Sequence, residues 1–172
     1  MVRMAPRVAF LLPLLALLLC SATQVAAQQA VAVFPFEIVD GTLESGVSDP
    51  QAHRQRLDAV TRRLRTRLQD SGRYRVVDIA PVVEEARSHN LQNCGGCASD
   101  MAARVGADLA VTGLVHKVSN LILSMTITVH DTKTGAPVAR AVADFRGDND
   151  ESWTRALDWL VRNRLLAPGG RP

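Results

Sequence analysis

The clearest alternation of apolar and polar side chains lies between residues 121 and 130. Every second residue there is large and apolar, from Leu121 through Ile127 to Val129, and the residues between them are mostly serine, threonine or histidine. A period of two places successive side chains on opposite faces of a strand. We therefore predict a strand with one buried face and one wetter face.

Four further strands are predicted from β-rich runs bounded by turn residues. They cover residues 30–38, 73–78, 108–118 and 137–146. Pro35 lies inside the first run and lacks an amide hydrogen, so it predicts a sheet edge or a bulge. The last run carries Ala139, Ala141 and Ala143 on one face, where a helix can approach closely.

Apolar residues at helical spacing predict a long helix over residues 51–71, which ends before Gly72. Shorter helices are predicted over residues 82–89 and from a cap at Ser99 or Asp100 to Gly106. A last helix follows residues 148–151. Its predicted core stripe consists of Trp153, Leu157, Leu160, Val161 and Leu165.

The predicted order of elements is β-α-β-α-α-β-β-β-α. One mixed sheet of about five strands, packed by about four helices, accommodates this order. We therefore expect a single α/β (α+β) domain built as a two-layer or three-layer sandwich.

The first 27 residues differ from the rest of the chain. Arg3 and Arg7 precede an unbroken apolar run over residues 8–19, and small residues follow up to Ala27. This pattern predicts a signal peptide over 1–27, with cleavage near Ala27, and a periplasmic or secreted domain over 28–172. Lipidation at Cys20 is an alternative, although Leu19 departs from the small residue that such processing prefers.

Removing the predicted signal changes the composition. It leaves 145 of 172 residues, and two of the 20 basic side chains leave with it, so 18 basic face 17 acidic side chains and the net charge is +1. Near-neutral charge, few aromatic residues and export together argue against nucleic-acid binding. No later run reaches the length of a transmembrane helix, so none is expected in the mature chain.

Cys94 and Cys97 form a Cys-Gly-Gly-Cys element just before the predicted third helix. In an oxidising compartment we expect them to form a disulfide. A static bridge is one interpretation. A second is redox catalysis, because the positive end of a helix dipole favours a thiolate. A third is a metal site that adds His89 and either His116 or His130, although we expect no metal.

Several motifs across the chain resemble a family of exported proteins of unknown function from Gram-negative bacteria. The motifs lie within residues 32–36, 72–78, 106–113, 129–135 and 150–165. More distantly, their order is similar to the N-terminal domain of TolB-type proteins and to the periplasmic domain of the curli-secretion lipoprotein. The resemblance implies an envelope domain that contacts other proteins without catalysis, and it transfers no catalytic residue.

Arginines dominate the predicted long helix, and Arg54, Arg62 and Arg65 together with Trp159 of the last helix form a possible partner surface. An anionic partner is one interpretation of the arginines, and a solvated helix face is the other. Trp159 either completes the core or contacts a partner.

Two acidic segments admit a functional and a structural interpretation. Asp148, Asp150 and Glu151 could suggest calcium, but helix capping fits their spacing better. His130 and Asp131 at a hairpin are interpreted as a surface pair, because no nucleophile is identifiable beside them.

The sequence therefore favours a non-catalytic envelope protein that binds another component of the cell envelope and needs no cofactor. Two alternatives stay open. One is a periplasmic thiol-disulfide redox protein that uses Cys94 and Cys97. The other is a module that binds a small ligand.

Overall fold

The structure is a computed structural model, and it describes residues 28–43 and 48–167. The predicted signal peptide over residues 1–27, with Cys20, lies outside the described residues. Within the described part of the chain, no helix combines the length and the apolar character needed to cross a membrane.

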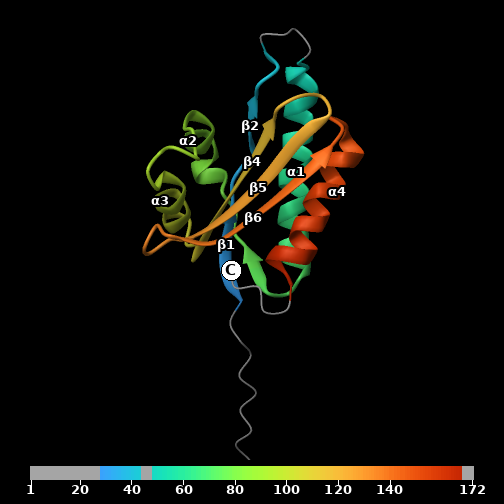
Figure 1. Ribbon diagram of the computed structural model, residues 1–172. Coiled ribbons are helices and arrows are strands. Elements are labelled where there is room, and N and C mark those ends of the chain that lie inside the picture. Colours follow the sequence, from blue (N-terminus) through green and yellow to red (C-terminus); the bar gives the residue numbers. More distant parts are fainter. Residues whose placement is uncertain (1–27, 44–47, 168–172) are drawn as a thin grey trace, which may run out of the picture.

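A mixed six-stranded sheet forms the centre of the molecule (Figure 1). Its strands are β1 (Gln29–Val33), β2 (Glu37–Asp40), β3 (Tyr74–Val76), β4 (Leu109–Lys117), β5 (Ile122–Asp131) and β6 (Pro137–Arg146). The order is β3-β1-β4-β5-β6, with β2 also paired to β4. β1 and β2 run parallel to their neighbours, whereas β4, β5 and β6 are antiparallel. This architecture confirms the predicted mixed sheet and α+β class.

The sixth strand arises because Pro35 splits the predicted first strand into β1 and β2. β1 lies between β3 and β4, whereas β2 pairs with β4 alone among the described strands. The strand is therefore interrupted at Pro35, where the chain passes from a central position to an edge of the sheet. The flanking phenylalanines pack into different core clusters, Phe34 beside α2 and α3 and Phe36 beside α1 and α4. The Phe36 amide donates to Oγ1 of Thr61 at 3.0 Å.

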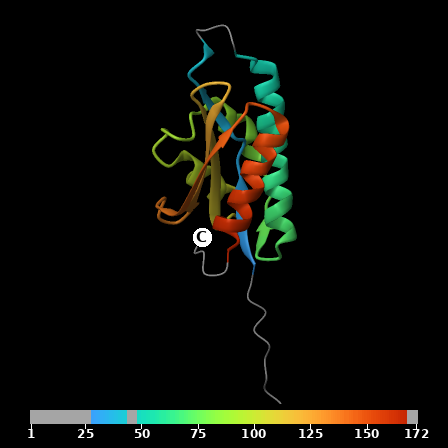
Figure 2. The same ribbon diagram turned by 45° about the vertical axis from the view of Figure 1, so that its right-hand side comes forward.

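Two helices cover one face of the sheet, α1 (Pro50–Asp70) and α4 (Asp150–Leu160), which continues as the single π-helical turn η3 (Val161–Leu165). They lie side by side along that face (Figure 2). Trp153 and Leu64 are among the fully buried side chains between the helices and the sheet. The predicted core stripe of the last helix is buried in full, and Ala141 packs beneath it as expected.

The opposite face is only half covered. The 3-10 turn η2 (Ala80–Val82), α2 (Val83–Ser88) and α3 (Cys97–Arg104) pack against β1 and β4, with Met101 at the centre of the contact. Figure 1 shows these helices on the side of the sheet away from α1 and α4. Ser124, Thr126 and Thr128 of β5 point to this face and are half-buried, so the predicted wetter face of this strand is confirmed.

The predicted start of the third helix is wrong. α3 begins at Cys97 with Gly96 as its N-cap, and Ser99 is buried within its first turn instead of capping it. Gly96 has a φ of +109°, which side-chain-bearing residues rarely adopt. The left-handed residue lets the helix start directly at the second cysteine of the Cys-Gly-Gly-Cys element.

Candidate functional site

A groove of about 810 Å³ lies between the loop before α3 and the uncovered half of the sheet. One wall includes Leu91, Gly95 and Ala98, from this loop and the start of α3. Its floor is formed by side chains from three strands, namely Leu114, Thr126, Thr128, His130 and Arg140. The size lies within the range of about 300–1,000 Å³ that is usual for binding sites in proteins.

The groove has a mixed apolar and polar lining that lacks acidic groups. Among the described residues that line it, none is aspartate or glutamate, and Arg140 is a cation beside the imidazole of His130. Nδ1 of His130 lies 3.3 Å from the carbonyl oxygen of Gly135, and no hydrogen bond links His130 to a hydroxyl in the described ranges. The groove therefore offers hydrogen-bonding and cationic groups without a paired nucleophile and base.

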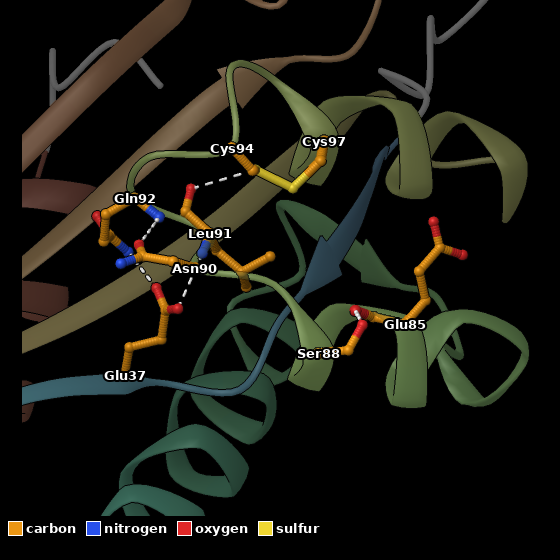
Figure 3. Close-up of a disulfide and its surroundings, with 8 residues drawn as sticks. All are labelled: Glu37, Glu85, Ser88, Asn90, Leu91, Gln92, Cys94 and Cys97. Atoms are coloured by element: carbon orange, nitrogen blue, oxygen red, sulfur yellow. Dashed lines mark hydrogen bonds between the residues drawn. A yellow bond between two sulfur atoms is a disulfide. The ribbon is translucent and has the colours of Figure 1, made fainter.

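A disulfide joins Cys94 and Cys97 at the edge of the groove, with their Cα atoms 5.6 Å apart (Figure 3). Both cysteines are half-buried. Sγ of Cys94 lies 3.7 Å from the carbonyl oxygen of Leu91. A bonded sulfur carries no proton, so this approach is a packing contact.

Glu37 at the start of β2 holds the same loop from the other side. Its carboxylate accepts a hydrogen bond from the Leu91 amide at 2.8 Å and one from the Gln92 side chain at 2.9 Å (Figure 3). The loop is therefore fixed by the disulfide within it and by Glu37 beneath it. This wall of the groove is formed before any ligand arrives.

We expect the disulfide to make a modest contribution to stability. It closes a loop of four residues, for which chain entropy predicts a loss of about 2 kcal/mol in the double variant Cys94→Ser/Cys97→Ser. Urea unfolding of the variant and the wild type measures this difference. A loss much larger than about 2 kcal/mol would show that the bridge organises more of the fold than its own loop.

The predicted partner surface is divided by the fold. Arg54 and Arg62 are exposed on α1, and Arg65 is half-buried. Trp159 is 40% exposed, so its interpretation as a core residue is wrong, and it lines a separate hollow beside β6. The guanidinium of Arg164 lies 5.3 Å from the centre of its ring. The structure therefore places Trp159 beside β6 and apart from the α1 residues Arg54, Arg62 and Arg65.

Other arginines of α1 pair with α4. Arg63 contacts Asp158 through two hydrogen bonds of 2.8 and 2.6 Å, and Arg67 lies 3.6 Å from the same carboxylate. These pairs neutralise part of the basic helix face. They also hold the two helices together on the sheet.

A buried charge cluster lies at the end of the sheet where β2, β4, α1 and the β6–α4 connection meet. We define it by five side chains: Asp40, His53, Arg56, Lys117 and Asp148. Nζ of Lys117 lies 2.8 Å from Asp148 and 3.8 Å from Asp40, and its side chain is only 1% exposed. Trp153 also donates to Asp148 through its ring N–H at 3.0 Å.

The cluster is closed to substrates. Its two aspartates and His53 have side chains no more than 9% exposed, so only Arg56 at 17% approaches the surface. Two carboxylates face one lysine and one arginine, which balances the formal charge without counting His53. The cluster acts as a clamp that joins four segments, and not as a reaction centre.

Both aspartates of the cluster favour their charged form. Burial raises the pKa of Asp40, but hydrogen bonds from Ser48 and Thr42 and the charge of Lys117 outweigh it and hold the pKa at about 2. Burial likewise raises the pKa of Asp148, and the hydrogen bonds from His53 and Lys117 reverse this and lower it.

Acid unfolding tests this electrostatic arrangement. Because Asp40 has a folded pKa near 2 against an ordinary 3.8, its stabilisation is complete above about pH 4 and is lost as the pH falls toward 2. This lowering of the pKa corresponds to a contribution of about 2 kcal/mol to the free energy of unfolding. We expect Asp40→Asn to be destabilised at pH 7 and to approach the wild type as the pH falls through this window.

Unfolding followed by circular dichroism at a series of pH values measures the free energy of unfolding of Asp40→Asn and of the wild type. Asp58, an exposed aspartate of α1, provides the matched control, and Asp58→Asn should leave stability unchanged. A difference between Asp40→Asn and the wild type that stays constant down to pH 2 would contradict the assignment.

Asp150 and Glu151 lie in the first turn of α4, as the capping interpretation predicts, whereas Asp148 does not cap the helix. Asp148 belongs to the buried cluster, and the cap of α4 is Asn149, whose side chain accepts from the Ser152 amide at 2.9 Å. Asp131 accepts from the amides of Lys133 and Thr134 and so organises the β5–β6 hairpin. Hydrogen bonds to its carboxylate, from Thr134 first, lower its pKa.

A protein-family profile matches residues 29–165 of this chain, and its description reads DUF3280, Protein of unknown function (DUF2380). No curated protein matches. The match confirms the resemblance to a family of unknown function, whereas its exported character and the likeness to TolB-type domains stay predictions.

Solved structures with a similar fold include the LpoB C-terminal domain from Escherichia coli, with a TM-score of 0.50 at 15% identity over 73% of this chain and 87% of that chain. Another is lipoprotein GNA1162 from Neisseria meningitidis, with a TM-score of 0.48 at 16% identity over 77% of this chain and 92% of that chain. At this identity, the likeness to LpoB establishes the fold alone.

Proposed function

This chain belongs to the DUF3280 family of unknown function, and we propose that it is an exported, non-catalytic domain that binds an acidic segment of another envelope protein in the groove. The observation that carries this proposal is the half-covered sheet face, where a preformed wall stands beside a polar, acid-free floor. Export rests on the predicted signal peptide.

The chemistry of the floor selects the partner. Arg140 and His130 favour carboxylates, and the hydroxyls of Thr126 and Thr128 provide hydrogen bonds to side chains or to an extended backbone. Leu114 and Leu91 add apolar contact at the sides. A mixture of a few directed polar groups and apolar walls is typical of binding sites that achieve specificity without reaction.

Site-specific photo-crosslinking in the exporting cell tests the proposal. A photoreactive residue replaces Thr128 in the groove, and the matched control replaces Thr66, an exposed threonine of α1 on the opposite side of the sheet. We expect the Thr128 probe, and not the Thr66 probe, to form one adduct with an acidic segment of an envelope protein.

A charge reversal in the groove provides the second arm of this experiment. Adding Thr126→Glu places a carboxylate in the floor, and we expect it to suppress the Thr128 adduct by like-charge repulsion. Equal adducts at both probe positions, or a captured segment without acidic residues, would contradict the proposal. An adduct with a small molecule would favour the alternative of a small-ligand module.

Thiol-disulfide exchange is a second candidate, and the position of Cys97 at the first residue of α3 favours it. We expect instead that the bridge is structural, with a reduction potential below about −300 mV. Equilibration with glutathione buffers measures it. A potential near that of glutathione, with crosslinking lost in Cys94→Ser/Cys97→Ser, would favour the redox function.

A further inference from the structure

The two edges of the sheet differ in the length of their strands. One edge is divided between β3 and the four-residue β2, which pairs with β4 alone among the described strands. β3 at one edge has three residues, whereas β6 at the other has ten. β6 also presents exposed apolar side chains, with Val138 at 40% and Val142 at 46% exposure. Natural proteins usually shorten, charge or cover such an edge because its free backbone groups pair with other chains. β6 is therefore the long strand that pairs on one side only in the described part of the chain.

The hydrogen-bond alternation fixes which residues of β6 face outward. The Gly147 amide donates to the Leu121 carbonyl at 3.2 Å. From this pair along the β5–β6 register, every second pair of facing residues is joined by backbone hydrogen bonds between the two strands. The residues between them direct their N–H and C=O groups away from β5. These outward residues are Arg140, Val142, Asp144 and Arg146.

This outward row is complementary to itself. When two copies of β6 pair antiparallel about a two-fold axis at Val142, the Arg140 of each lies opposite the second copy's Asp144. Val142 then lies against its own counterpart in the centre. Both charged side chains are exposed, and neither forms an ion pair within the described part of the chain. Opposite charges in directly facing positions favour this register over others.

A hollow of about 500 Å³ flanks the same stretch of β6 on the helical side. It is bounded by residues 142–146 of β6 and by Arg155, Ala156 and Trp159 of α4. The small side chain of Ala143 leaves room beneath the edge. A second copy that continues the sheet would cover Trp159, which is the more exposed of the two tryptophans, since Trp153 is fully buried.

We propose that the protein forms a two-fold dimer through antiparallel pairing of β6 with the β6 strand of a second copy. The two sheets join into one, with Val142 on the axis and two Arg140–Asp144 pairs beside it. This inference goes beyond the proposed partner function. The two share Arg140, which also lines the groove, but the dimer requires only the β6 edge and no occupant of the groove.

Sedimentation velocity of the purified domain over a wide range of concentrations tests the dimer. We expect the wild type to show twice the mass of one chain at high concentration. Asp144→Arg places like charges opposite each other and should yield a monomer. The exchange Arg140→Asp/Asp144→Arg restores opposite charges and should restore the dimer, which a general loss of folding would not allow.

Tryptophan fluorescence provides an independent reading. Acrylamide should quench Trp159 in the Asp144→Arg monomer and quench it less in the wild-type dimer, whereas Trp153 is shielded in both. Unchanged circular dichroism shows that each variant is folded. A monomeric wild type at all concentrations, a dimer unaffected by Asp144→Arg, or no rescue by the exchange would overturn the proposal.

Discussion

Replacing Asp148 by asparagine should lower the free energy of unfolding by about 3–5 kcal/mol. The change keeps the shape of the side chain but removes the charge that faces Lys117 and Arg56. Lys117 is 1% exposed and would keep only Asp40, at 3.8 Å, as a charged partner. A buried cation that loses its counter-ion cannot be compensated by water, which makes the loss large.

Asp158→Asn is the matched control for this change. Like Asp148, Asp158 contacts arginines of α1. It lies within α4, and its pairs with Arg63 and Arg67 are partly exposed. Exposed pairs contribute about 0–1 kcal/mol, so the control should be nearly neutral. Urea unfolding measures both variants. Equal losses in the two would contradict the assignment of a buried clamp.

A double-mutant cycle separates the charge effect from general damage. Lys117→Met should cost less in the Asp148→Asn background than in the wild type, because the unpaired cation is then removed. Additive losses would indicate that the two side chains act independently. The cycle therefore tests the pair itself rather than either residue.

Gly113→Ala should be the second most damaging substitution, at about 3 kcal/mol. A Cβ atom at Gly113 would lie 2.4 Å from the ring of Phe36, which is 4% exposed and packs in the core beside α1. The ring cannot move aside without displacing its buried neighbours, and overpacking of this kind costs about 1–3 kcal/mol and occasionally more. Thermal unfolding measures the loss.

The partner variant Phe36→Leu distinguishes a clash from a loss of strand geometry. A smaller side chain leaves room for the added methyl group, so Gly113→Ala should cost clearly less in the Phe36→Leu background. An undiminished loss would place its cause in the backbone of β4 and not in the contact with Phe36.

The strands and helices follow from local periodicity, because each element carries its own pattern. The alternation around Met125 and the helical stripe around Leu64 determine which side chains are buried, whatever the neighbours are. The division at Pro35 was more difficult to predict. Whether a proline marks an edge or a break depends on which strands lie on either side, and that is set by the parallel pairing of β1 with β3 and β4.

The buried cluster was missed because its members are far apart in the sequence. Each has an ordinary local interpretation, such as a loop aspartate for Asp40 or a helix cap for Asp148. One signal was present: Lys117 continues the inward-facing positions of β4, and His53 lies four residues before Leu57 on the buried stripe of α1. Polar residues at buried positions indicate that a partner is required.

The groove depends on a tertiary arrangement that local patterns do not encode. The wetter face of β5 was predictable from Thr126, Thr128 and His130, but nothing in that strand indicates that the Cys94–Cys97 loop stands beside it. Glu37 secures that loop across more than fifty positions of sequence. Only the structure brings the disulfide and the polar strand face together.

Titration calorimetry with the captured acidic segment tests partner binding in the groove most directly. Thr128→Glu should weaken binding by about tenfold or more through like-charge repulsion, whereas the matched change Thr66→Glu on α1 should leave the affinity unchanged. Equal affinities for Thr128→Glu and the wild type, or equal losses in both variants, would contradict a partner site in this groove.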